Sequence, residues 1–134
     1  MALTKAQKEM QKCIPFVKAL SQKDVNKETW REVLLQENMF TLISILAILE
    51  IGRDSFFSDT FKPKSNPETF FSRHRNVTVR EQQNATKDIL VKFILNKLLL
   101  HKYMETAYTV LSLENLDDAS SRLADLGVAD PQEE

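Results

Sequence analysis

The side chains with catalytic or metal-binding potential are few and scattered. The chain has one cysteine, Cys13, and two histidines, His74 and His101; these are not spaced as zinc ligands are, and there is no His-Glu-x-x-His pattern. Cys13 lies in an apolar stripe at helical spacing, where a cysteine is more often a small core residue than a nucleophile. The two glycines stand 75 residues apart, so no glycine-rich loop can hold phosphate. These residues predict no catalytic site, no metal site and no cofactor.

One segment combines basic and aromatic side chains. Residues 53–81 hold five of the eight phenylalanines and six Lys/Arg residues, diluted by four acidic residues. Such phenylalanines can anchor a loop to the core, form a hot spot for a protein partner, or stack on bases beside phosphate-binding cations. The candidate partner-binding residues are Phe56, Phe57, Phe61, Phe70, Phe71, Arg73 and Arg75. The nucleic-acid alternative uses residues 62–80.

The elements that position these side chains are predicted to be helices. In the run from Met39 to Ile51 only three residues are not apolar. It is shorter than the roughly 20 residues of a membrane span and longer than a typical buried strand. Asn38 is suited to cap a helix here and Gly52 to end it. Because a helix that is apolar on every face is buried on every face, this segment is predicted to be the centre of the domain.

Helical patterns continue on both sides of this centre. Pro15 interrupts the N-terminal apolar stripe and is expected to kink or split the first helix. After a proline-containing loop, Asn66-Pro67-Glu68 can start a short helix with proline in its first position. Thr78 to Glu81 forms a capping-box pattern, which is predicted to open a long helix from about Val79 to Leu100 or beyond.

The stretch Ile94–Glu114 partially resembles the LisH-type dimerisation motif, in which a hydrophobic helix runs into Tyr-x-x-Thr-Ala-x-x-hydrophobic. The matching residues are Ile94, Leu98, Tyr103, Thr106, Ala107 and Val110. The stretch departs from the motif at Lys97, where the family prefers an aromatic residue, and at Lys102, where a glycine would make the turn. The family pairs two such helices from each chain, so the resemblance implies a homodimer interface with Ile94, Leu98, His101 and Tyr103. The alternative is one continuous helix from Val79 to about Leu111.

Length and composition fit one ordinary globular domain. The 134 residues carry a net charge of −1, which gives no overall field toward nucleic acid or anionic lipid. We predict an all-α domain over residues 1–127, a compact bundle of five to seven helices around 39–51. An irregular Phe-rich segment is expected at about 53–77 and a flexible acidic tail at 128–134. The lone cysteine and the lack of an apolar signal core at the N-terminus favour an intracellular location, cytoplasmic or nuclear, and no membrane association.

The expected function is that of a non-catalytic protein–protein interaction module: an adaptor, regulatory or assembly subunit. It would act through apolar helix faces and the 53–75 segment. Its partner is expected to be another protein or a second copy in a homodimer. The alternative is a small nucleic-acid-binding protein, for which the weak positive charge of the basic segment gives less support.

Overall fold

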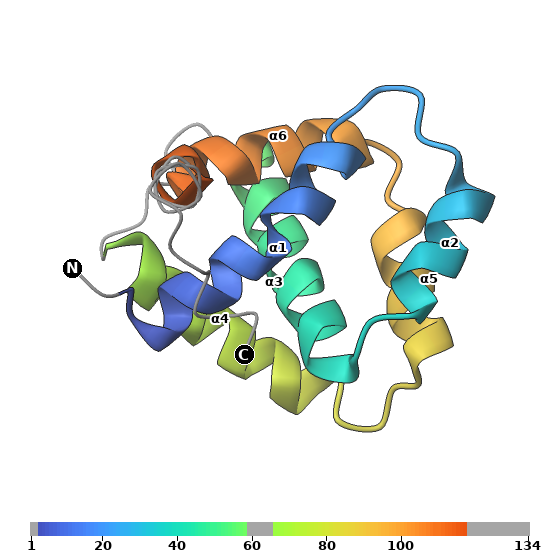
Figure 1. The fold of residues 1–134 in the computed structure, drawn as a ribbon, viewed down its shortest axis with the longest axis horizontal. Coiled ribbons are helices and arrows are strands. Elements are labelled where there is room, and N and C mark those ends of the chain that lie inside the picture. Colours follow the sequence, from blue (N-terminus) through green and yellow to red (C-terminus); the bar gives the residue numbers. More distant parts are fainter. Residues whose placement is uncertain (1–2, 59–65, 118–134) are drawn as a thin grey trace, which may run out of the picture.

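The structure, a computed structural model, describes residues 3–58 and 66–117 (Figure 1). Its six longer helices are α1 (Lys5–Leu20), α2 (Lys27–Leu35), α3 (Met39–Phe57), α4 (Pro67–Glu81), α5 (Lys87–Leu95) and α6 (Leu100–Val110). A short helix at 113–117 follows α6, and the described ranges hold no strand. The predicted all-α bundle of five to seven helices is confirmed.

The α3 helix is the centre of the bundle, as predicted. Every residue from Thr41 to Leu49 is buried. The helices α1, α4, α5 and α6 all pack against α3, which crosses the middle of the molecule in Figure 1. This burial explains why the Met39–Ile51 run needs no polar face. None of the described helices combines the length and the apolar character needed to cross a membrane.

Asparagine side chains start three of the helices. The side-chain oxygen of Asn38 accepts a hydrogen bond from the backbone N–H of Thr41 at 2.8 Å, which begins α3. Asn26 and Asn66 cap α2 and α4 in the same way. Pro67 is the first residue of α4, where its missing N–H costs no helical hydrogen bond. The caps predicted at Asn38 and Asn66 are therefore confirmed.

The long helix predicted from about Val79 is wrong, and so is its continuation to Leu111. The α4 helix already contains Thr78 and ends at Glu81, α5 begins after a new cap at Thr86, and a second break at 96–99 precedes α6. Thr78 does not cap; its hydroxyl is buried and donates to the backbone carbonyl of His74 at 3.0 Å. The physical reason lies in packing, because folding back at these breaks lets both α5 and α6 lie against α3.

The end of α3 also differs from the prediction. The helix does not stop at Gly52 but continues to Phe57. The segment 53–77, expected to be irregular, is helical at 53–57 in α3 and at 67–77 in α4. Residues 59–65 lie outside the described residues, as do the predicted domain end at 127 and the acidic tail at 128–134. The α1 helix is not split, because it runs through Pro15 without ending.

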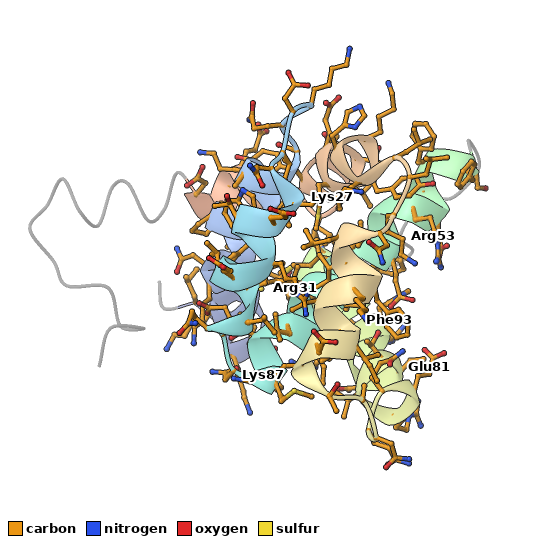
Figure 2. The ribbon with its side chains drawn as sticks, turned by 90° about the vertical axis from the view of Figure 1, so that its right-hand side faces the viewer. Lys27, Arg31, Arg53, Glu81, Lys87 and Phe93 are labelled. Atoms are coloured by element: carbon orange, nitrogen blue, oxygen red, sulfur yellow. The ribbon has the colours of Figure 1, made fainter. Side chains whose placement is uncertain are left out.

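The α2 helix lies on the outside of the bundle, packed against α5. Leu34 is its one buried residue. Figure 2 shows Arg31 between α2 and α5, where its guanidinium pairs with Asp88 of α5. The pair is exposed to solvent and of small expected worth, so α2 is held mainly by Leu34 and by Trp30 and Leu35, which pack partly buried against the core.

The first helix is joined to the far end of the described chain. The side-chain amide of Gln11 donates to the backbone carbonyl of Leu116 at 3.0 Å, and 105 residues separate the two. Nearby, the ammonium of Lys18 lies 2.9 Å from the carboxylate of Asp117. The α1 helix also packs on α3, α4 and α6. Its place over the core therefore depends on contacts from both halves of the chain.

Candidate functional site

The phenylalanines predicted to bind a partner divide between core and surface. Phe71 is completely buried, and Phe70 packs partly buried against the same core. Phe56 and Phe57, in the last turn of α3, are 36% and 68% exposed. Phe61 lies outside the described residues. The two rings of α3 are therefore the part of this set that a partner can reach in the described structure.

Phe56, Phe57 and Tyr103 form what we term the aromatic cluster. The ring centroids of Phe56 and Phe57 are 5.3 Å apart. The ring centroid of Tyr103 lies 5.7 Å from that of Phe56 and 5.8 Å from that of Phe57. The interplanar angles of 60–77° are edge-to-face or tilted, the arrangements that aromatic quadrupoles favour. Tyr103 itself is buried on α6. It holds two exposed rings of α3 from beneath.

The cluster depends on the close approach of α3 and α6. Gly52 stands one turn before the two phenylalanines, and a Cβ atom added there would overlap the carbonyl oxygen of Tyr103. A side chain at this position would therefore push the helices apart. The sequence placed Tyr103 in a dimer interface and the two phenylalanines in a separate partner site. Nothing in their spacing of more than 40 residues along the chain signals that they meet.

Arg75, predicted to contact a partner, is engaged within the protein instead. Its guanidinium forms an ion pair with Glu9 of α1, and the two side chains are only 13% and 11% exposed. The guanidinium carbon also lies 5.1 Å from the ring centroid of Phe40 and 5.7 Å from that of Phe71, distances typical of cation–π contacts. Arg75 thus joins α4 to α1 and α3. Arg73 is exposed on α4.

Of the residues predicted to form a homodimer interface, some are buried and others are exposed. Ile94 and Tyr103 are buried within the chain's own core, while Leu98 is 92% exposed in the 96–99 turn and His101 is partly exposed. Lys102 lies inside α6, so the turn between the two helices falls before it. A dimer that uses Leu98 stays a prediction. Ile94 and Tyr103 would contribute to it only by shaping the surface from beneath.

Cys13 is placed as a core residue. Burial raises the pKa of its thiol from 9.0 to about 12, and the nearby Glu9 carboxylate acts in the same direction. The thiolate, which is the nucleophilic form, is therefore scarce at neutral pH. Within the ranges 3–58 and 66–117, no group of three or more His, Cys, Asp or Glu side chains is arranged to hold a metal ion.

The raised pKa of Cys13 predicts a pH-dependent stability. Above pH of about 9 the thiol ionises in the unfolded chain but stays protonated in the folded protein, so ionisation favours unfolding. The free energy of unfolding should fall by about 1.4 kcal/mol per pH unit from this group between the two pKa values. Urea unfolding of the protein and of Cys13→Ala at several pH values from neutral to about 10 isolates this slope. Equal slopes in the two proteins would contradict a buried thiol.

Comparison of the chain with protein-family models, with curated proteins and with solved structures finds no match. The function is therefore inferred from the residues of this chain alone.

Proposed function

We propose that the chain is a non-catalytic protein-binding module that engages its partner through the aromatic cluster. The observation that carries this proposal is the exposure of Phe56 and Phe57 at the end of a helix whose preceding residues are the most buried of the protein. Neighbouring apolar side chains that are exposed together are a mark of protein interaction sites.

The geometry of the cluster suits recognition. Binding energy in protein interfaces concentrates in a few aromatic or arginine residues that are held rigidly before the partner arrives. Phe56 and Phe57 are fixed by each other and by Tyr103, so little side-chain entropy is lost on binding. Arg53 and Asp54, one turn earlier on α3, are partly exposed and form an ion pair at 3.3 Å. They supply a polar rim beside the rings.

The nucleic-acid alternative draws less support from the same region. It needs basic side chains that reach phosphates beside rings that stack on bases. Arg75 is instead paired with Glu9, and Phe71 is buried beneath it. Arg73 and Arg80 are exposed on α4, whereas Lys62 and Lys64, the other cations of this alternative, lie outside the described residues. Protein binding is therefore the function that the geometry favours.

The double variant Phe56→Ala/Phe57→Ala tests this proposal. Because the two rings are exposed, the variant should keep the helical circular dichroism and most of the stability of the parent protein. Capture of a partner from cell extract should fall by about tenfold or more. The solution mass of each protein, measured by light scattering at low and high salt, shows whether the captured partner is a second copy of the chain.

Phe93→Ala is the matched control for this experiment. Phe93 is also a phenylalanine near a helix surface, 42% exposed on α5, and Figure 2 shows it on a different helix from the cluster. Its removal should leave partner capture unchanged. If Phe93→Ala abolished capture and the double variant did not, the binding face would lie on α5 and the proposal would be wrong. Capture that weakens steeply with salt would instead favour nucleic acid.

A further inference from the structure

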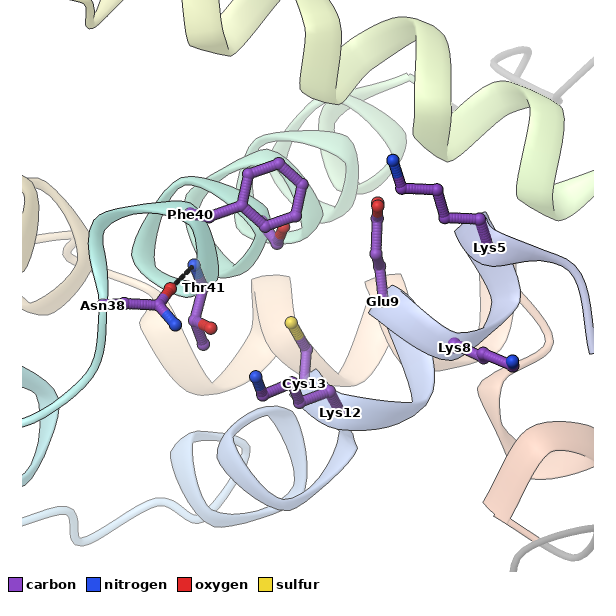
Figure 3. A pocket seen from close by; sticks show the side chains of 9 residues that line it. Lys5, Lys8, Glu9, Lys12, Cys13, Asn38, Phe40 and Thr41 are labelled. Carbon is purple, nitrogen blue, oxygen red and sulfur yellow. Dashed lines mark hydrogen bonds between the residues drawn. The ribbon is translucent and has the colours of Figure 1, made fainter. Parts of the chain in front are cut away.

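A pocket of about 270 Å³ lies between the first half of α1 and the first turns of α3 (Figure 3). Its α1 wall carries Cys13 and the stems of lysine side chains, and its α3 wall carries Phe40 and Ser44. Figure 3 shows the sulfur of Cys13 and the ring of Phe40 facing the same space from opposite helices. The volume is near the lower end of the range for small-molecule sites. The pocket is distinct from the aromatic cluster, which lies at the other end of α3.

The charges around this pocket favour an anion. Lys5, Lys8 and Lys12 line it at helical spacing on α1. Glu9, the one acidic residue among the described residues of the wall, has its charge matched by Arg75 of α4. The N-terminus of α3, a helix of 19 residues, also opens here, and its backbone dipole adds a partial positive charge. Among the described residues, the pocket therefore combines the Lys5 and Lys12 side chains with a helix N-terminus, and the charge of its acidic residue is matched.

The second observation is the hydroxyl of Ser44 in the pocket wall. Ser44 is 1% exposed, and its oxygen has no hydrogen-bond partner among the described residues. A buried hydroxyl without a partner is costly in a folded protein. Such a group is satisfied when a water, an ion or a ligand supplies the missing partner. Because this hydroxyl is covered by the protein, a neighbouring side chain of the wall must shift when an acceptor atom enters.

We propose that this pocket binds a small amphipathic anion, with a carboxylate or phosphate head and a short apolar body. The head accepts a hydrogen bond from the Ser44 hydroxyl and lies within reach of the Lys5 and Lys12 ammonium groups. The apolar body lies along Cys13 and the Phe40 ring toward the opening. Binding makes the missing hydrogen bond of Ser44 and neutralises part of the lysine cluster. The site is independent of the protein-binding function proposed for the aromatic cluster.

Titration with sodium octanoate, followed by backbone amide shifts in NMR, tests this assignment. Saturable binding with a Kd on the order of 1 mM or tighter is expected for an anion of this size, with the largest shifts in the first half of α1 and the first turns of α3. Octyl phosphate should bind the same residues, and the tighter of the two identifies the preferred head. Acetate, which lacks the body, and octanol, which lacks the charge, should each bind at least about tenfold more weakly.

Variants separate ligand binding from a structural role. Ser44→Ala should weaken octanoate binding by about tenfold while the unliganded protein keeps or raises its Tm, because a partnerless buried hydroxyl is removed. Lys5→Ala/Lys12→Ala should weaken binding and remove most of its salt dependence, whereas Lys102→Ala on α6 should change neither. Phe56→Ala/Phe57→Ala should leave the octanoate Kd unchanged. Absence of saturable binding, shifts centred on Tyr103, or an unaltered Kd in Ser44→Ala would each overturn the proposal.

Discussion

Gly52→Ala should destabilise the protein by at least about 3 kcal/mol. A Cβ atom at this position would overlap the carbonyl oxygen of Tyr103 and would lie 2.8 Å from its carbonyl carbon and 3.0 Å from the Cβ of Ala107. Two of these neighbours are backbone atoms of α6, which cannot move aside as a flexible side chain can. The helices α3 and α6, whose contact is the most extensive in the fold, would have to separate. Urea unfolding at neutral pH measures the loss.

The expected loss of stability in Gly52→Ala is opposite in sign to the usual effect of this substitution in a helix. In an exposed helix, Gly→Ala normally stabilises by about 1 kcal/mol because alanine has the higher helix propensity. Ser55→Ala, three residues further along α3, serves as the control, since its buried hydroxyl has no hydrogen-bond partner among the described residues. That variant should change the free energy of unfolding by less than about 1 kcal/mol. A stabilised Gly52→Ala protein would show that α3 and α6 do not approach as closely as described.

Phe71→Ala should cost about 4 kcal/mol of unfolding free energy. Its ring is among the largest side chains with no exposed surface, and truncation leaves a cavity that the surrounding helices can only partly close. The Arg75 guanidinium also loses one of its two aromatic contacts. For a domain with a typical stability of about 5–15 kcal/mol, this loss is enough to unfold a substantial fraction of molecules on mild heating. Thermal and urea unfolding followed by circular dichroism measure it.

Phe57→Ala is the natural comparison, because the same substitution is made at a ring that is mostly exposed. Its cost should stay below about 1 kcal/mol. The two variants together decide between the roles first open to the phenylalanines of residues 53–75. Equal and small costs would mean that Phe71 is not a core residue and would return it to the candidate binding surface.

The sequence was sufficient for the features that depend on local composition. The apolar run at Met39–Ile51 can be buried only as a central helix, and Asn38 and Asn66 have side chains that compete well for the first free N–H groups of a helix. The caps act within four residues, and the apolar run is one continuous segment of the chain. The central helix and its caps could therefore be predicted without knowledge of the fold, and they indicated the all-α class.

The sequence was not sufficient where packing overrides local preference. Thr78 and Glu81 have the spacing of a capping box, yet they lie in the last turn of α4. The chain breaks only after them, at 82–86, and this break lets α5 pack against α3. Gly52 has the type of a helix end but is needed for the contact with Tyr103. The meeting of the α3 rings with Tyr103 and the lysine-lined pocket are likewise products of tertiary structure. Helical spacing of Lys5, Lys8 and Lys12 was the one linear signal for the pocket, and it is equally typical of a solvated face.

The hydrogen bond between Gln11 and Leu116 has a consequence for synthesis on the ribosome. A chain made at about 5–20 residues per second needs roughly 5–20 s to reach Leu116 after Gln11 has been added. During that interval α1 has neither its terminal partner nor α6, although its apolar stripe, which includes Met10, Cys13 and Ile14, has already emerged or is emerging. The nascent N-terminal helix thus exposes apolar side chains until the partners that cover them have been made. Completion of the fold must await release of the C-terminal third of the chain from the exit tunnel.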